Sequence, residues 1–151
     1  MKKILLLPTL LTLLSCSREI ECQDPPINLS FIAIPQTALD TIVLRKFTKD
    51  DNFRYKVDSL KVKTFITNRG DTSIVSLGDP FYYVTAGYDW QIFLPAINRT
   101  IALTEINKLD KTGKCAALST DCFCNDEILG IKVDNQPGVL QTYPVYRLVI
   151  R

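Results

Sequence analysis

Five cysteines carry most of the chemistry that this sequence offers. Cys16 closes an apolar leader, and the other four are Cys22, Cys115, Cys122 and Cys124. An even number of thiols in an exported chain indicates two disulfides. A bridge between Cys122 and Cys124 would be strained, because a single residue separates them. Cys115 is therefore expected to pair with either Cys122 or Cys124, and Cys22 with the other.

Metal binding is the alternative use of these thiols. Cys115, Cys122 and Cys124 could supply three thiolates to one ion, and Cys22 a fourth. Their spacing is not the repeated C-x-x-C pattern of structural zinc sites, and the chain has no histidine. The pattern therefore favours disulfides, and we expect no metal and no other cofactor.

The sequence offers little else for catalysis. Without histidine, the Ser-His-Asp and Cys-His arrangements are excluded. Glycine-rich phosphate-binding motifs and the G-x-S-x-G elbow are absent. No pair among the 16 acidic residues is marked out for hydrolysis, and the turn at Asp50 and Asp51 does not follow an EF-hand loop. We expect no enzymatic activity, with a small envelope enzyme as the remote alternative.

The first residues have the pattern of an export signal. Lys2 and Lys3 precede an apolar run over residues 4–14, which is shorter than the roughly 20 residues that span a bilayer. The run ends in LLSC at residues 13–16, which resembles the lipobox of bacterial lipoproteins. In that family the cysteine thiol receives a diacylglycerol and the leader is cut just before it. The resemblance implies a signal peptide over residues 1–15 and a lipid on Cys16.

The same resemblance implies a location. Two or three acyl chains on one cysteine hold a protein at a membrane almost permanently. Ser17, rather than Asp, follows the cysteine, and in such lipoproteins an Asp there retains the protein at the inner membrane. We expect the outer membrane, on either its surface or its periplasmic face. Residues 16–26 are expected to form a lipidated tether, and residues 27–151 a single domain.

The charge balance bears on the partners. The chain has 18 Lys and Arg residues against 16 Asp and Glu residues, and residues 1–15 contain two lysines and no acid. From Cys16 onward the two signs balance at 16 each. A neutral chain without basic blocks gives no electrostatic basis for binding nucleic acid. The expected partners are the membrane, through the lipid, and an envelope protein or a glycan.

Short β-rich segments separated by polar or Gly/Pro turns run through the rest of the chain. None of them shows a sustained 3.6-residue repeat, so the pattern is typical of an all-β sandwich. The fold class that we predict is an immunoglobulin-like β-sandwich of about 7–9 short antiparallel strands. The expected strands lie in residues 27–34, 40–48, 54–66, 72–77, 81–95, 101–106, 127–135 and 143–151.

The segment around Trp90, the only tryptophan, carries a second resemblance. GYDWQIFLPAINRTIALTEI, the cysteine-rich loop after it and ILGIKVDN resemble small lipoproteins of Gram-negative bacteria that sort proteins to the cell surface. That group brings no assigned activity. Trp90 lies within an expected strand, which favours a place in the core.

The functional hypothesis is a membrane-anchored, non-catalytic binding module of the cell envelope. The alternative is an accessory or structural subunit of an outer-membrane uptake or assembly complex. Tyr82, Tyr83 and Tyr88 are the candidate ligand-facing aromatics, and an exposed stripe of them would favour a glycan. A large exposed apolar patch would favour a protein complex.

Overall fold

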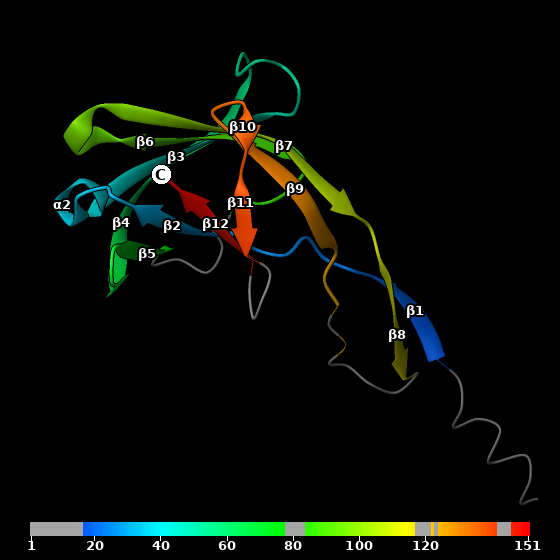
Figure 1. The fold of residues 1–151 in the computed structure, drawn as a ribbon. Helices are drawn as coiled ribbons and strands as arrows, with labels where there is room; N and C mark the ends of the chain where they lie inside the picture. Colours follow the sequence, from blue (N-terminus) through cyan, green and yellow to red (C-terminus); the bar gives the residue numbers. More distant parts are fainter. Residues whose placement is uncertain (1–16, 78–83, 117–121, 123, 142–145) are drawn as a thin grey trace, which may run out of the picture.

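The computed structural model of the chain describes residues 17–77, 84–116, 122, 124–141 and 146–151. This part is almost entirely β-strand, which confirms the all-β fold class (Figure 1). The first strands are β1 (Ser17–Glu21), β2 (Asn28–Ile32), β3 (Thr41–Thr48), β4 (Lys56–Arg69), β5 (Thr72–Leu77) and β6 (Tyr88–Leu94). They are followed by β7 (Arg99–Leu109), β8 (Thr112–Ala116), β9 (Glu127–Val133), β10 (Gln136–Pro137), β11 (Val139–Gln141) and β12 (Arg147–Ile150). Two helical turns, α2 (Gln36–Leu39) and η2 (Pro95–Ile97), lie between strands.

Ten strands form one hydrogen-bonded order, β10-β9-β7-β6-β3-β4-β5-β2-β12-β11. The order folds over into two facing layers, and β4 is the strand that belongs to both (Figure 1). Its residues 56–63 pair with β3, and residues 64–69 pair with β5. An immunoglobulin domain has two separate sheets, whereas here one long strand connects the layers through hydrogen bonds.

Gly138 connects the two edge strands of the ten-stranded sheet. β10 and β11 lie at opposite ends of the strand order, yet only Gly138 separates them in the chain. The Gly138 amide donates a hydrogen bond to the Ile131 carbonyl of β9 at 2.8 Å. A Cβ atom at this position would lie 3.0 Å from side-chain atoms of Ile131, Val133 and Leu148. The crossing between layers is therefore tightly packed around Gly138, and an added side chain would have to displace its neighbours.

We expect Gly138→Val to destabilise the fold by about 1–3 kcal/mol, because overpacking forces neighbouring side chains out of place. Chemical denaturation monitored by circular dichroism measures the change. Gly130→Val is the matched control, since Gly130 lies in β9 and a Cβ atom added there would have no heavy atom within 4 Å. Equal stability of the two variants would show that the Gly138 crossing is not tightly packed.

The core lies between the layers and follows the two-residue alternation of the strands. Leu29 and Phe31 of β2 are almost fully buried and face Leu148 and Ile150 of the neighbouring strand β12. Trp90 is 7 % exposed and belongs to the same core, which confirms the prediction of core packing. The largest fully buried side chains are Phe31, Ile27, Leu29, Leu39, Ile42, Ile92, Leu94, Ile101, Leu103, Ile106, Leu148 and Ile150.

Two details of the predicted sandwich differ in the structure. The strands are not all antiparallel, because β12 pairs with β2 in parallel. Among the described residues the sandwich contains ten strands rather than about 7–9, in part because the very short β10 and β11 count as separate strands. Hydrogen-bond partners far apart in sequence decide both details, and local alternation does not report them.

A two-stranded arm extends from the sandwich (Figure 1). It consists of β1 and β8, which pair antiparallel from Ser17↔Ala116 to Glu21↔Thr112. Within the expected tether of residues 16–26, β1 pairs with β8, and the Cys22 and Gln23 amides donate hydrogen bonds to the carbonyls of Lys111 and Cys124. Within the described part of the chain, no helix has the length and apolar character needed to cross a membrane.

Candidate functional site

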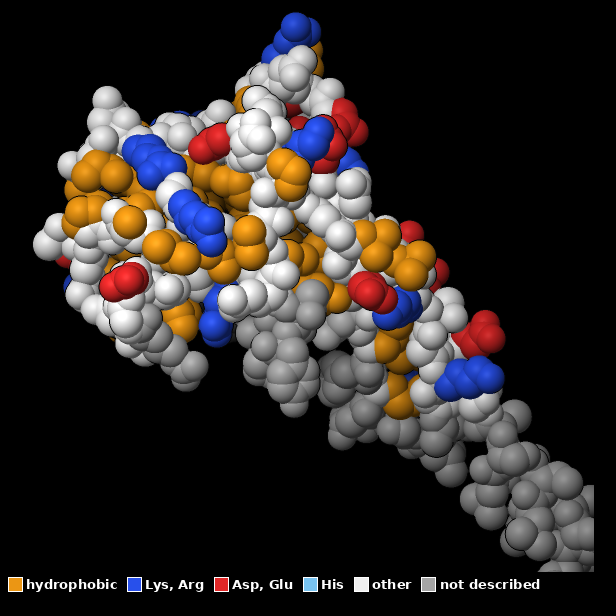
Figure 2. All heavy atoms as spheres, in the orientation of Figure 1, with side chains coloured by type: hydrophobic (Ala, Val, Ile, Leu, Met, Phe, Trp, Pro, Cys, Tyr) orange, Lys and Arg blue, Asp and Glu red, His pale blue; other side chains and the backbone are white. Residues whose placement is uncertain are grey.

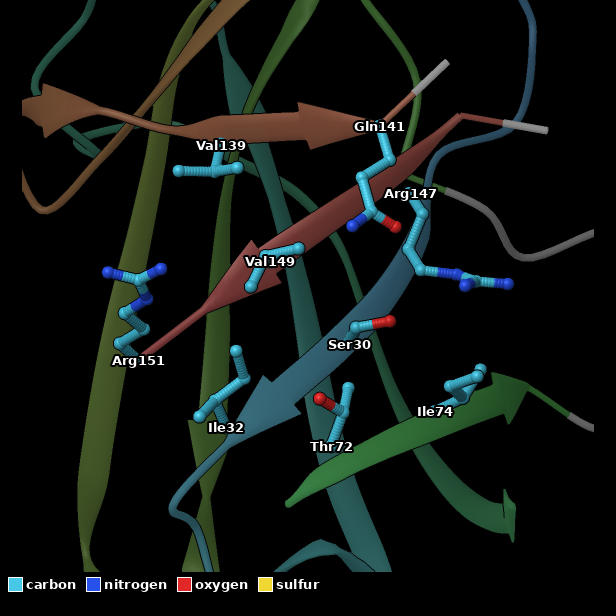
Figure 3. A pocket seen from close by; sticks show the side chains of 9 residues that line it. All are labelled: Ser30, Ile32, Thr72, Ile74, Val139, Gln141, Arg147, Val149 and Arg151. Carbon is cyan, nitrogen blue, oxygen red and sulfur yellow. The ribbon is translucent and has the colours of Figure 1, made fainter. Parts of the chain in front are cut away.

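A hollow of about 240 Å³ lies on the outer face of the layer that contains β11, β12, β2 and β5. Leu29 and Phe31 point into the core, so Ser30 between them points to the opposite face. The same alternation directs Arg147 and Val149 of β12 outward. We call this depression the outer hollow, and Figure 3 shows the side chains that line it.

The outer hollow combines an apolar surface with positive charge. Arg147 and Arg151 line it, together with the polar side chains of Ser30, Thr72 and Gln141. No acidic residue is among the described residues that line it. Figure 3 shows Arg147 and Arg151 at different ends, with Val149 between them. The apolar lining consists of Ile32, Ile74, Val139 and Val149.

Two polar atoms at this site are buried and lack a hydrogen-bond partner in the described structure. They are the Ser30 Oγ and the Arg147 Nε. Ser30 is fully buried although it faces outward, because Ile74 and Val149 stand directly beside it on the neighbouring strands. Leaving a buried polar group without a partner costs about 1–3 kcal/mol. Both groups can donate a hydrogen bond, so a ligand with an acceptor would remove this cost.

The chemistry available in the outer hollow is binding rather than nucleophilic catalysis. A serine nucleophile needs a neighbouring general base. The lining residues include neither histidine nor a carboxylate that could serve Ser30 in that role. An arginine and a hydroxyl are instead the groups that recognise anionic or strongly accepting ligands.

A second concentration of charge lies where the arm joins the sandwich, centred on Lys108 near the end of β7. Its Nζ lies 2.7 Å from carboxylate oxygens of Asp24 and Asp110 and 2.8 Å from Asp126. Asp126 is buried and also accepts a hydrogen bond from the Lys111 amide at 2.9 Å. The hydrogen bonds that the Lys108 ammonium donates to these carboxylates raise the pKa of Lys108 above its usual range. Asp126 accepts hydrogen bonds from the Lys108 ammonium and from the Lys111 amide, and these two bonds lower its pKa.

The directions of these shifts predict a pH dependence. Because the pKa of Asp126 is lower in the folded chain, its contribution to stability is present above the ordinary pKa of 3.8 and is lost as the pH falls through the folded value. We expect Asp126→Asn to be less stable than the parent chain at pH 7. The difference should shrink when the urea midpoints of both proteins are measured at pH 3. A difference that stays constant between the two pH values would contradict a stabilising charge on Asp126.

The pKa of Asp89 in β6 is shifted in the opposite direction to that of Asp126. Asp89 lies beside the turn that contains Asp50 and Asp51. It is 3 % exposed, and its Oδ2 accepts a hydrogen bond from the Asp50 amide at 2.9 Å, while Oδ1 has no partner among the described residues. Burial raises the pKa of Asp89, and the nearby charges of Asp50 and Asp51 raise it further. Asp51 accepts hydrogen bonds from the amides of Arg54 and Tyr55, so this turn is closed by its own aspartate.

Asp89→Asn is therefore expected to increase stability at pH 7. The ionised carboxylate costs stability above the folded pKa, and that cost disappears as the pH falls through it. The Tm of the variant should exceed that of the parent at pH 7, and the two values should converge at pH 4. Asp89→Leu is the control, because it leaves the Asp50 amide without its acceptor and should lower the Tm at both pH values. A lower Tm for Asp89→Asn at pH 7 would show that the charge is favourable.

The structure accounts for the predicted cysteines. Cys22 pairs with Cys124, and Cys115 with Cys122, which is one of the two arrangements that the sequence left open. Gly113 of β8 makes room for the first bridge, since a Cβ there would lie 2.8 Å from the Cys124 sulfur. Across the described residues, no group of three or more His, Cys, Asp or Glu is arranged to hold a metal ion.

The predicted aromatic stripe is only partly within the described chain. Tyr82 and Tyr83 lie outside the described residues, as does Cys16. Tyr88 of β6 is half-buried, packs against the core, and has the Lys46 ammonium 3.6 Å from its ring centroid. A ring whose face is covered by a lysine is not an open platform for a sugar, so Tyr88 belongs to the packing of β3 against β6.

The outer hollow itself was not predicted from the sequence. Alternation in β2 indicates that Ser30 faces away from Leu29 and Phe31, but it suggests an exposed hydroxyl. Its burial depends on β5 and β12, which lie more than forty residues away. Arg147 carries no motif, so its place beside Ser30 follows only from the parallel β12–β2 pairing.

Comparisons of this chain with protein-family models, with curated proteins and with solved structures give no match.

Proposed function

We propose that this chain is an exported lipoprotein, anchored through a lipid on Cys16, whose domain acts as a non-catalytic binding module at the outer membrane. The leader pattern and the LLSC sequence support the export and the anchor. The arm adds a structural argument, because Ser17, the residue directly after Cys16, pairs with Ala116 of β8. A lipid on Cys16 would thus attach to the end of the paired arm rather than to a long linker.

The observation that carries the binding role is the pair of buried donors at the outer hollow. Proteins seldom leave a buried serine hydroxyl and an arginine Nε without partners, and such exceptions need an explanation. A ligand that accepts from both groups supplies that explanation. The surrounding side chains offer no general base, which supports binding over catalysis.

Titration with small probes of different charge tests whether the outer hollow binds a ligand. The full chain, isotope-labelled and purified in detergent micelles, would be titrated with small anionic, neutral and cationic probes while amide signals are followed by NMR. We expect the amide signals of β2, β11 and β12 to shift saturably, and those of β3 and β6 in the other layer to stay unchanged. If no probe of any charge perturbs the outer hollow, the binding role of this face is wrong.

A further inference from the structure

We infer that the outer hollow binds a small aliphatic carboxylate, held by Arg147 and Ser30. This inference rests on the proposed binding role and adds to it the chemical class of the ligand. It follows from three properties of the hollow, namely its charge, its unpaired donors and its size.

Charge selects an anion. Arg147 and Arg151 both line the outer hollow, and none of its described lining residues carries a negative charge. By contrast, Lys108 of β7 is surrounded by three carboxylates, so it cannot attract an anion in the same way. Among the cationic groups described, Arg147 is the one that combines a place in a hollow with a buried nitrogen that lacks a partner.

The unpaired donors select a carboxylate. A guanidinium presents Nε–H and a terminal N–H side by side, which matches the two oxygens of a carboxylate. The Ser30 hydroxyl, which Figure 3 shows directed toward the side of the hollow where Arg147 lies, provides a third donor. The Arg147 Nε and the Ser30 Oγ are both buried, so a ligand reaches them when Arg147 and the side chains that flank Ser30, Ile74 and Val149, change rotamer.

The remaining lining selects an aliphatic body. Val149 stands beside Ser30 on one side, and Ile74 stands beside it on the other. No aromatic ring is among the described lining residues, which disfavours a sugar that stacks on a ring. The volume of about 240 Å³ is below the range of roughly 300–1,000 Å³ that larger ligands occupy, so the body is short. Figure 2 shows apolar side chains with basic and acidic groups among them on the body of the molecule, and charges of both signs along the arm.

Hexanoate is the probe for the test, and hexanamide and hexylamine are its neutral and cationic analogues. The full chain in detergent micelles would be labelled with ¹⁵N-arginine, so that the Arg147 Nε–H signal can be followed directly and assigned by its loss in Arg147→Lys. We expect hexanoate to shift this signal saturably and to bind about tenfold or more tightly than hexanamide. The two analogues also serve as controls for partition of the probe into the detergent micelle, because that partition does not depend on Arg147.

Ser30→Ala separates a binding role from a structural one. It removes an unpaired buried hydroxyl, so we expect the variant to be at least as stable as the parent while its affinity for hexanoate falls several-fold. Arg45→Gln is the matched control, because Arg45 faces outward on the other layer, over the Phe93 ring, and should not change the affinity.

Two results would overturn the inference in distinguishable ways. Equal binding of hexanoate, hexanamide and hexylamine at the outer hollow would refute the carboxylate while leaving the binding role in place. The absence of any shift at the hollow with all three probes would refute both. Unchanged hexanoate affinity in Arg147→Lys and Ser30→Ala would likewise refute the assignment of these two residues.

Discussion

Replacing Cys22 and Cys124 together by alanine is expected to lower the free energy of unfolding by about 4–5 kcal/mol. The bridge joins residues 102 positions apart, so it closes a long loop in the unfolded chain and restricts its conformations. It also fixes the start of the chain on the arm, next to the hydrogen bond from the Cys22 amide to the Lys111 carbonyl. Urea denaturation of oxidised protein, monitored by circular dichroism, measures the loss.

The second bridge is the internal control for this prediction. Cys115 and Cys122 are only 7 positions apart, so removing both should cost about 2.5 kcal/mol by the same chain-entropy argument. Chymotrypsin cleavage after Phe123 separates Cys122 from Cys124 and allows the pairing to be read from unreduced peptides. A larger loss from the short bridge, or a peptide linking Cys115 to Cys124, would contradict the described arm.

Trp90→Ala is expected to destabilise the sandwich by about 3–5 kcal/mol, the usual cost of removing a large buried aromatic side chain. Trp90 is 7 % exposed and stands between Lys46 of β3 and Leu103 of β7 in the register of the sheet. Its Nε1 donates a hydrogen bond to the Thr85 carbonyl at 3.0 Å. The loss combines a cavity with an unpaired carbonyl, and thermal denaturation with a urea series measures it.

Trp90→Phe distinguishes the two contributions. Phenylalanine fills most of the space but cannot donate to Thr85, so we expect an intermediate loss of stability. Tyr88→Ala is a useful comparison, because Tyr88 is only half-buried on the same strand. A cost for Trp90→Ala that is no larger than that for Tyr88→Ala would contradict a central place for Trp90 in the core.

The strands were the most predictable part of the fold, because alternation is a local signal. Leu60 and Val62 in β4 alternate with exposed polar residues, and the buried Ile92 and Leu94 in β6 alternate with the less buried Gln91 and Phe93, as the sequence indicates. The crossing between layers at Gly138 could not be predicted, because a single glycine in the sequence does not reveal that Ile131 and Leu148 approach it. The parallel β12–β2 pair joins residues 119 positions apart, which no local pattern reports.

The candidate site was less predictable than the fold. The cysteines were found from number and spacing alone, but two pairings were left open, because sequence spacing fixes no distance in space. Ser30 and Arg147 gave no signal, since their importance depends on burial and on missing partners, which are properties of the folded chain. The contact of Tyr88 with Lys46 was not predictable either, because Lys46 comes from another strand.

Lipid attachment at Cys16 is the central claim, because it determines where the domain is displayed. Intact mass measurement of the protein purified from the outer-membrane fraction of a Gram-negative host tests it most directly. We expect a chain that begins at Cys16 and carries the added mass of a diacylglycerol and of any further acyl chain, both absent from Cys16→Ala. A chain that keeps residues 1–15, or that begins elsewhere without lipid, would contradict the account.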